Sequence, residues 1–423
     1  MREVMALVLS GGGGERLSVL SSERAVSAIP FGGKYRIIDF ALSNCCHSEI
    51  ERIGVITQYA PTSLHDHIGS GRAWDLDRRG GGIVILQPYQ TRTSAGWYRG
   101  TADAIAQNWD VIEERGCSRV LILSGDHVYL MDYRALIDAH LAQGAEATLA
   151  VAPVAADQTH RFGIVTLDAA GDVERLVEKP RERIGSLASM GVYVFECRAL
   201  RDRLQDSSVD LVVDVVTPML ASGTRVAAHR FESYWEDVGT IASYYRANLE
   251  LLEDEPKLVL DDRRWPILTR DEERPPVRIG DQARIERSLI SNGCRIEGTV
   301  RRSVLSPGVV VEPGAVIEDS VVLQDVVVGR EARVRRSILD KYARIGERAR
   351  IGAWAAPADA RAIPGPAWLE GLVLIGKDSR LPAGLCVEPG VVVGVAALPT
   401  DFAQAVVPAG TEIANRTWYG ADA

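Results

Sequence analysis

The sequence of 423 residues has no long apolar run. No stretch approaches the roughly 18 continuous apolar residues that a membrane helix needs. The amino terminus enters a strand-like segment within a few residues, which leaves no room for a signal peptide. We therefore expect a cytoplasmic protein without a membrane partner.

Clustered cysteines and an excess of positive charge are also missing. The six cysteines are scattered, with no Cys-x-x-Cys pair and no histidine cluster at ligand spacing, so neither a disulfide framework nor a structural zinc site is expected. The net charge is −9, whereas nonspecific nucleic-acid binding depends on a basic surface. We expect no nucleic-acid partner, and an anionic substrate must be met by local positive charge.

The composition that is present is typical of a globular protein. Hydrophobic residues make up 46% and charged residues 25% of the chain. Its length exceeds the size at which a single hydrophobic core keeps growing, which predicts two domains. We place a first domain at residues 1–254, a linker at 255–275 and a second domain at 276–423.

In the first domain, strand-like apolar runs alternate with helix-like segments. This alternation predicts an α/β sheet with crossover helices. The predicted strands cover residues 5–9, 53–57, 119–123, 147–151 and 192–195, and the predicted helices cover 101–115, 133–143 and 241–253.

After residue 276 the pattern changes, and aliphatic residues recur at intervals near six or its multiples. A hexapeptide period predicts a parallel β-helix, in which each turn buries aliphatic side chains. A β-sandwich is the alternative, although it would place turn signals about every 8–12 residues. An alanine- and proline-rich segment at 354–370 interrupts the repeat and is predicted to be a loop.

The strongest functional pattern lies at residues 7–17, Leu-Val-Leu-Ser-Gly-Gly-Gly-Gly-Glu-Arg-Leu. Glycines that follow a buried strand let backbone N–H groups approach an anion that a Cβ atom would hold off. Arg16 adds fixed positive charge. The pattern predicts a phosphate-binding loop, and a simple tight turn is the alternative.

Further blocks follow in an order that resembles the ADP-glucose pyrophosphorylase (glucose-1-phosphate adenylyltransferase) family over nearly the whole chain. They are Phe31-Gly-Gly-Lys-Tyr-Arg-Ile-Ile-Asp-Phe40, Trp97-Tyr-Arg-Gly-Thr-Ala-Asp-Ala104, Ser124-Gly-Asp-His-Val-Tyr129, Val177-Glu-Lys-Pro180 and Tyr234-Trp-Glu-Asp-Val-Gly-Thr240. The resemblance implies a Rossmann-like nucleotidyltransferase domain followed by a left-handed parallel β-helix. It also implies a homotetramer, or a heterotetramer with a catalytic paralogue. The implied reaction joins ATP and glucose 1-phosphate into ADP-glucose and pyrophosphate, with Mg²⁺, for glycogen or starch synthesis.

The resemblance assigns roles residue by residue. The implied catalytic residues are Arg16, Asp126 and Lys179, and the implied metal ligands are Asp126 and Asp237. The implied nucleotide-binding residues are Leu9, Gly11, Gly12, Gly14, Gln58, Tyr98, Gly100, Thr101 and Asp126. The implied glucose-1-phosphate residues are Gly163, Glu178, Lys179, Ser189, Gly191 and Asp237. Arg24 and Arg36 match arginines that bind an anionic allosteric effector.

The position of Asp126 in the sequence supports a metal-binding role independently of the resemblance. It follows the predicted strand 119–123, and open α/β sheets bind ligands at the carboxyl ends of their strands. Carboxylate oxygens are the ligands that Mg²⁺ prefers. A turn or helix-capping aspartate is the alternative.

The chain departs from the family pattern at one phosphate-binding position. Where the family has Arg-Ala-Lys-Pro-Ala, this sequence reads Arg24-Ala-Val-Ser-Ala28, so Val26 replaces a lysine. Loss of one transition-state stabiliser costs on the order of 10²–10³ in turnover. Three hypotheses stay open: an adenylyltransferase with reduced turnover, a non-catalytic regulatory subunit, and a transferase for another base or sugar. Glu23 stands where some members have lysine, and Arg24 and Arg36 have surface ion pairing as their alternative role.

Overall fold

The computed structural model describes residues 3–78, 81–89, 96–352 and 365–416. The chain forms two compact units. The first, here called the sheet unit, comprises Met1–Gly12, Ile38–Trp235 and Arg263–Leu268. The second, here called the β-helix unit, comprises Gly13–Ile37, Glu236–Asp262 and Thr269–Ala423. The domain boundaries expected from the sequence, at 254 and 276, remain a prediction.

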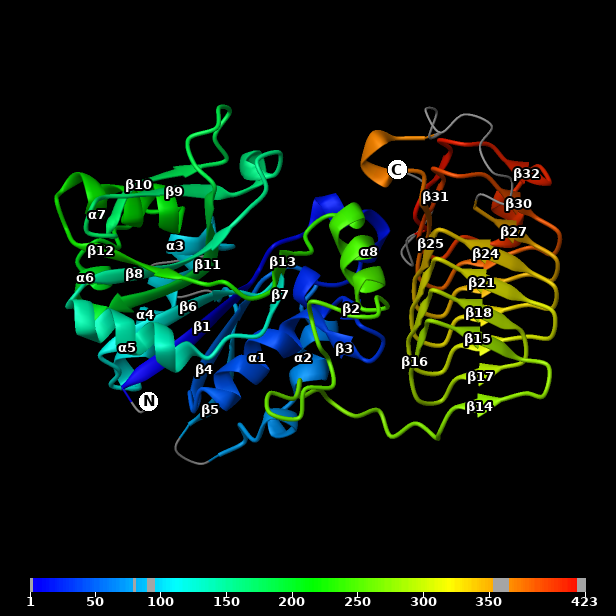
Figure 1. Cartoon of the computed structure of the whole chain (residues 1–423), viewed down its shortest axis with the longest axis horizontal. Helices are drawn as coiled ribbons and strands as arrows, with labels where there is room; N and C mark the ends of the chain where they lie inside the picture. Colours follow the sequence, from blue (N-terminus) through cyan, green and yellow to red (C-terminus); the bar gives the residue numbers. More distant parts are fainter. Residues whose placement is uncertain (1–2, 79–80, 90–95, 353–364, 417–423) are drawn as a thin grey trace. The chain divides into compact units, whose positions relative to one another are not determined.

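The sheet unit is built on one nine-stranded sheet (Figure 1). Its main path runs β10-β9-β11-β6-β1-β4-β5, and β8 pairs with β11 and β12 beside that path. The strands β1, β4, β5 and β6 are parallel, and β11 is antiparallel to β6. The strands are β1 (Val4–Ser10), β4 (Arg52–Thr57), β5 (Gly82–Leu86), β6 (Arg119–Ser124), β8 (Ala147–Pro153), β9 (Gly163–Leu167), β10 (Val173–Glu178), β11 (Leu187–Glu196) and β12 (Val226–Arg230). The predicted α/β fold is confirmed.

The central strand β1 shows why this sheet forms. Met5, Ala6, Leu7 and Val8 are all fully buried, and an unbroken apolar run suits a parallel strand that is covered on both faces. Leu9 of β1 lies beside Ser124 of β6, and Ser10 of β1 lies beside Thr57, the last residue of β4. The three strands therefore end at the same level, and the loops that follow them share one edge of the sheet.

The helices differ from the sequence prediction at two points, and the smaller is that the helix predicted at 241–253 ends at Glu250. The segment 101–115, expected as one helix, forms α3 (Thr101–Gln107) and α4 (Trp109–Glu114). Asn108 separates them, because its side-chain amide donates to the Ala104 carbonyl at 2.8 Å and to the Tyr98 hydroxyl at 2.9 Å. An asparagine that bonds locally in this way competes with the helical backbone. The remaining helices are α1 (Ile37–His47), α2 (Thr62–Ile68), α5 (Tyr133–Gln143), α6 (Cys197–Arg201), α7 (Thr217–Ala221) and α8 (Ile241–Glu250).

The β-helix unit carries three parallel sheets, and successive coils contribute short strands to them in turn (Figure 1). The first sheet contains β14 (Arg278–Ile279), β17 (Arg295–Ile296), β20 (Val310–Val311), β23 (Val327–Val328), β26 (Arg344–Ile345) and β29 (Arg380–Leu381). The second contains β15 (Arg284–Glu286), β18 (Thr299–Arg301), β21 (Val316–Glu318), β24 (Arg333–Arg335), β27 (Arg350–Ile351), β30 (Cys386–Val387) and β32 (Val406–Val407). The third contains β16 (Leu289–Ile290), β19 (Val304–Leu305), β22 (Val321–Val322), β25 (Ser337–Leu339), β28 (Val373–Ile375), β31 (Val392–Val393) and β33 (Glu412–Ile413). This is the predicted left-handed parallel β-helix, and the β-sandwich alternative is wrong.

A column of serines, of which Ser303, Ser320 and Ser337 are buried, runs through the coils of this unit. The backbone N–H of Ser303 donates to the Ser288 hydroxyl at 3.2 Å, that of Ser320 to Ser303 at 3.1 Å, and that of Ser337 to Ser320 at 3.2 Å. Each hydroxyl also donates to the carbonyl two residues earlier in its own coil. The stack satisfies backbone groups that would otherwise be buried without partners, and it fixes the register of successive coils.

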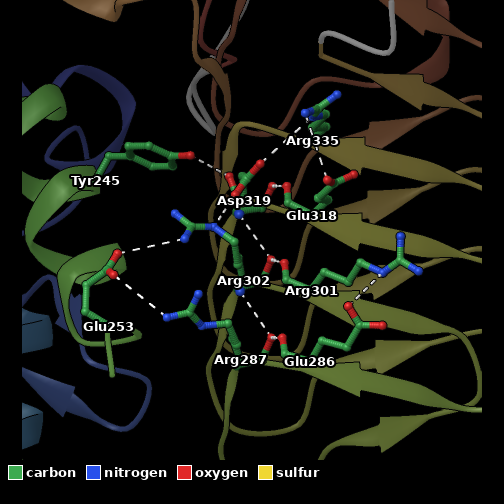
Figure 2. Close-up of polar contacts among 12 residues, drawn as sticks. Tyr245, Glu253, Glu286, Arg287, Arg301, Arg302, Glu318, Asp319 and Arg335 are labelled. Atoms are coloured by element: carbon green, nitrogen blue, oxygen red, sulfur yellow. Dashed lines mark hydrogen bonds and ion pairs between the residues drawn. The ribbon is translucent and has the colours of Figure 1, made fainter. Parts of the chain in front are cut away.

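One corner of the β-helix carries charged residues that hold α8 and the segment after it (Figure 2). Arg287, Arg302 and Asp319 occupy equivalent corner positions with φ of 44°, 42° and 46°. Glu253 lies 3.9 Å from Arg287 and 3.8 Å from Arg302, and the Tyr245 hydroxyl donates to the Asp319 carbonyl at 2.6 Å. These contacts lie within the β-helix unit and join the segment 236–262 to successive coils.

Part of the predicted insertion lies outside the described residues. Of the segment 354–370, residues 354–364 are not described, and Ala367–Leu369 form one 3₁₀ turn. The repeat then resumes, because β28 pairs with β25. Among the described residues no helix is long and apolar enough to cross a membrane. The cytoplasmic location stays a prediction.

Candidate active site

The glycine-rich loop begins at the sheet edge where β1, β4 and β6 end. The Gly125 N–H donates to the Leu9 carbonyl at 3.0 Å, and a Cβ atom on Gly125 would lie only 2.4 Å from the Ser10 hydroxyl oxygen. A Cβ atom on Gly11 would lie 3.7 Å from the Gln58 Cβ, whereas at Gly12 no atom of the described residues, apart from its chain neighbours, lies within 4 Å of such a position. The backbone at Gly12 is therefore open to a ligand.

Ser10 supplies a second sign of a ligand at this edge. Its side chain is only 6% exposed, and its hydroxyl has no hydrogen-bond partner among the described residues. Buried polar groups without a partner are uncommon in folded proteins. An unpaired hydroxyl at the start of a glycine-rich loop suits a bound anion.

Gln58 and Tyr98 act together at the end of β4. The Gln58 side-chain amide accepts from the Tyr98 N–H and donates to the Tyr98 carbonyl, the latter at 3.2 Å. The Tyr98 ring lies in the apolar core of the sheet unit, where burial raises the pKa of its hydroxyl. Gln58 therefore positions the Tyr98 backbone, and the aromatic ring contributes to packing.

Gly100 and Thr101 fix the start of α3. A Cβ atom on Gly100 would lie 2.5 Å from the Val209 carbonyl oxygen, so only glycine fits there. The Thr101 hydroxyl accepts from the Leu211 N–H at 2.8 Å. Both residues hold the amino end of α3 against the segment before the π-helix at Val212–Val216.

Asp126 follows β6 and precedes β7 (His127–Tyr129). Its carboxylate oxygen Oδ1 accepts from the Ser124 hydroxyl, and its side chain is 38% exposed. A carboxylate that is oriented by a neighbour and still open to solvent is suited to bind a hydrated divalent cation.

The predicted sugar-phosphate residues cluster around Gly163. Gly163 lies opposite Glu178 in the β9–β10 pair, and a Cβ atom on Gly163 would lie 2.9 Å from Glu178 Oε2 and 3.9 Å from the Ser189 Cβ. Lys179 Nζ lies 3.1 Å from Glu178 Oε1, and both side chains remain partly exposed. The cluster offers one ammonium group and one carboxylate beside the backbone of Gly163, where no side chain blocks the approach of a ligand.

Gly191 connects this cluster to Asp126. It has a φ of 66°, within a register irregularity of β11 between Ser189 and Tyr193. A Cβ atom on Gly191 would lie 3.1 Å from the Ser124 Cβ and 3.4 Å from His127 Cε1. The sheet unit thus brings the predicted metal ligand and the predicted sugar-binding strand together at one edge.

The other predicted residues belong to the β-helix unit. Gly14 has a φ of 61°, and a Cβ atom there would lie 2.2 Å from Val26 Cγ2, so the Val26 side chain lies directly against the glycine-rich loop. Gly239 borders both Asp237 and Arg16, because a Cβ atom on it would lie 2.7 Å from Asp237 Oδ1 and 3.5 Å from Arg16 Nη2. Asp237 Oδ1 accepts from the Gly239 N–H at 2.7 Å.

The residues of the predicted effector site also lie in the β-helix unit, where carboxylates of the same chain compensate part of their charge. Arg24 makes two hydrogen bonds of 2.8 Å to Asp340. Lys377 Nζ lies 2.8 Å from a Glu23 carboxylate oxygen. Arg36 is on β3 (Tyr35–Arg36), which pairs with β2 (Pro30–Phe31). An anionic effector would have to compete with these contacts.

His127, which lies in the block Ser124–Tyr129, is a residue of this site for which the sequence predicted no role. His127 Nε2 lies 3.5 Å from Asp126 Oδ1. Trp235, the first residue of β13 (Trp235–Asp237), packs perpendicular to the His127 ring with 5.3 Å between ring centroids. The signal that could have found it is an imidazole directly after a strand-ending carboxylate, since both are metal ligands.

Comparison with known families first gives the class. The family model described as nucleotidyl transferase matches residues 5–254. The model described as GlmU-like, C-terminal hexapeptide matches residues 276–364. The mixed sheet with a glycine-rich loop and an acidic strand end, joined in one chain to a β-helix, is thus that of a nucleotidyltransferase.

Curated relatives then give the particular family. The glucose-1-phosphate adenylyltransferase of Thermomicrobium roseum is 49% identical over 98% of this chain and 98% of the relative. The enzymes of that name from Pseudothermotoga lettingae and Bacillus mycoides are 46% and 45% identical over 74% and 73% of this chain, and 75% and 84% of their own lengths. The chain belongs to the glucose-1-phosphate adenylyltransferase family.

Proposed function

We propose that this protein transfers the adenylyl group of ATP to glucose 1-phosphate, which yields ADP-glucose and pyrophosphate for α-glucan synthesis. The observation that supports this most is the shared sheet edge. There the open backbone at Gly12, the carboxylate of Asp126 and the Glu178–Lys179 pair all lie within the sheet unit. The glucose 1-phosphate oxygen attacks the α-phosphorus of ATP, and the bond to pyrophosphate breaks without a covalent enzyme intermediate.

The residues of this chain would contribute by positioning and charge. Backbone N–H groups of the glycine-rich loop and the Arg16 guanidinium would hold the triphosphate. Lys179 would break its ion pair with Glu178 and bind the sugar phosphate instead. Glu178 would then accept hydrogen bonds from glucose hydroxyls. Orientation of two anions and neutralisation of the charge that builds between them account for most of the catalysis in such reactions.

We propose Mg²⁺ as the cation of this site, held by Asp126 and Asp237. The partly exposed, oriented carboxylate of Asp126 fits such an ion, and the role of Asp237 rests on the family resemblance. When bound, the ion would neutralise negative charge at the reacting phosphates.

Assembly and regulation are further parts of the proposal. The family resemblance supports a tetramer, and Arg24 and Arg36 are the proposed ligands of an anionic effector. Because Asp340 already binds Arg24 through both guanidinium nitrogens, we expect effector binding to be weak.

The test is a direct assay of the purified protein with ATP, glucose 1-phosphate and Mg²⁺. ADP-glucose and pyrophosphate should form in equal amounts, and Asp126→Asn should abolish both. ATP binding without any product would instead indicate a regulatory subunit. A higher kcat/KM with another nucleoside triphosphate would indicate a transferase for a different base.

A further inference from the structure

His127 presents one ring nitrogen to Asp126. The other ring nitrogen, Nδ1, lies 2.9 Å from the Met190 carbonyl oxygen. A carbonyl oxygen can only accept, so Nδ1 carries the hydrogen in this contact. In the neutral ring Nε2 then holds a lone pair, and this atom is the one that lies 3.5 Å from Asp126 Oδ1.

The neighbours of the ring favour this arrangement. The Trp235 indole nitrogen lies 3.3 Å from Nδ1, but the indole N–H could bond there only if Nδ1 carried no hydrogen. One tautomer cannot make both contacts, and the shorter contact to the Met190 carbonyl decides between them. Trp235 and Gly191 then border the ring and limit its rotation.

In this neutral form of the ring, two electron-pair donors face each other without a hydrogen between them. Asp126 Oδ1 already accepts from the Ser124 hydroxyl, and the Nε2 lone pair beside it adds repulsion. A cation bound to both atoms removes that repulsion. Neighbouring ligands about 2.1 Å from an octahedral ion lie about 3 Å apart, so the observed 3.5 Å needs little adjustment.

We propose that His127 Nε2 binds the divalent cation together with the Asp126 carboxylate. The inference rests on the proposed function, because the reaction supplies the reason for a cation at this edge. Imidazole nitrogen suits Mn²⁺ and other transition metals better than it suits Mg²⁺, which prefers oxygen. His127 therefore shifts the preference of the site toward Mn²⁺.

The experiment uses the full chain and Mn²⁺ alone. Pulsed electron paramagnetic resonance should show ¹⁴N coupling from a directly bound imidazole in the wild type and none in His127→Gln. Titration of the free Mn²⁺ signal should give an affinity at least about tenfold weaker for His127→Gln. The Mg²⁺ affinity, measured by competition with Mn²⁺, should fall less.

His160→Gln is the matched control, because His160 is an exposed histidine of the same unit, and it should keep both the coupling and the affinity. Circular dichroism and the thermal midpoint establish that each variant is folded. The inference is overturned if wild-type Mn²⁺ shows no ¹⁴N coupling, if Mn²⁺ does not bind, or if His127→Gln binds it as the wild type does. ADP-glucose synthesis by a wild type that lacks the coupling would overturn this inference and leave the proposed function intact. Coupling without ADP-glucose synthesis would support this inference and contradict the proposed function.

Discussion

Arg24 and Asp340, 316 residues apart in the chain, form a buried bidentate ion pair. The guanidinium nitrogens Nη1 and Nη2 donate to Oδ1 and Oδ2, each at 2.8 Å, and the side chains are 3% and 0% exposed. The pair fastens the segment just before Val26 to a coil of the β-helix. Loss of Arg24 should therefore lower the stability of the β-helix unit.

Removal of one partner should be strongly destabilising. Arg24→Ala removes the guanidinium that binds both oxygens of the buried Asp340 carboxylate, and breaking a buried pair in this way costs about 3–5 kcal/mol of unfolding free energy. Replacement of both residues by leucine should cost far less, because no charge is then left unpaired. Equilibrium urea unfolding followed by tryptophan fluorescence measures both effects.

An exposed ion pair of the same unit serves as the control. Arg287 lies 2.9 Å from Asp254, and the two side chains are 45% and 89% exposed. Arg287→Ala should cost less than about 1 kcal/mol, since solvent screens such pairs. Equal losses for Arg24→Ala and Arg287→Ala would contradict the role given to burial.

Val26→Lys tests the departure from the family sequence. The Val26 side chain lies against Gly14 of the glycine-rich loop, so a lysine there would extend its ammonium group along that loop. We expect kcat to rise by about 10² if the missing cation limits the rate. Steady-state assay of ADP-glucose formation measures the change.

The control for this gain is Val26→Met, which adds length without charge. Methionine should leave kcat near the wild-type value. An equal rise in both variants would mean that side-chain length matters more than charge, and no rise in either would mean that another residue already supplies the stabilisation.

The parts of this structure that were predicted are those that local sequence encodes. The unbroken apolar run before the glycines predicts β1, and the helix predicted at 133–143 matches α5. This helix begins after Asp132, whose side chain accepts from the Arg134 N–H. It ends before Gly144, which has a φ of 60°. Strand ends that share one edge follow from parallel pairing, so the place of Asp126 was also predictable.

The parts that were not predicted depend on partners far along the chain. The break at Asn108 needs the Tyr98 hydroxyl, the burial of Arg24 needs Asp340, and the tautomer of His127 needs the Met190 carbonyl. Hydrogen-bond partners of this kind are set by tertiary packing, and neither residue type nor spacing reveals them.

Lys179→Met should weaken glucose 1-phosphate binding more than ATP binding. The change removes the ammonium group that lies 3.1 Å from Glu178 and that we propose pairs with the sugar phosphate. We expect KM for glucose 1-phosphate to rise at least about tenfold, since a charge-assisted hydrogen bond contributes about 1.5–3 kcal/mol. Initial rates at varied concentrations of each substrate measure both KM values.

Lys257→Met is the control, because Lys257 is an exposed lysine without a proposed role, and it should change neither constant. If Lys179→Met raised both KM values equally, the lysine would contact both anions or affect the fold. Retention of the wild-type thermal midpoint separates those two outcomes.

Lys341 should make stability depend on pH in the alkaline range. Burial, assisted by Arg36 and Arg24, lowers the pKa of Lys341 from 10.5 to about 7. Between these values the unfolded chain binds more protons at this lysine than the folded chain does, so this group makes the unfolding free energy rise with pH. Below about pH 7 both states are protonated, and the full penalty of a buried charge remains.

Lys341→Met should remove that dependence, because a buried methionine carries no proton to lose. The gain in unfolding free energy relative to the wild type should be largest near pH 6.5 and should shrink steadily toward about pH 10. Urea unfolding of both proteins across this range, compared as a difference, cancels the titration of groups that they share. A difference that stays constant with pH would mean that Lys341 keeps its ordinary pKa in the folded state.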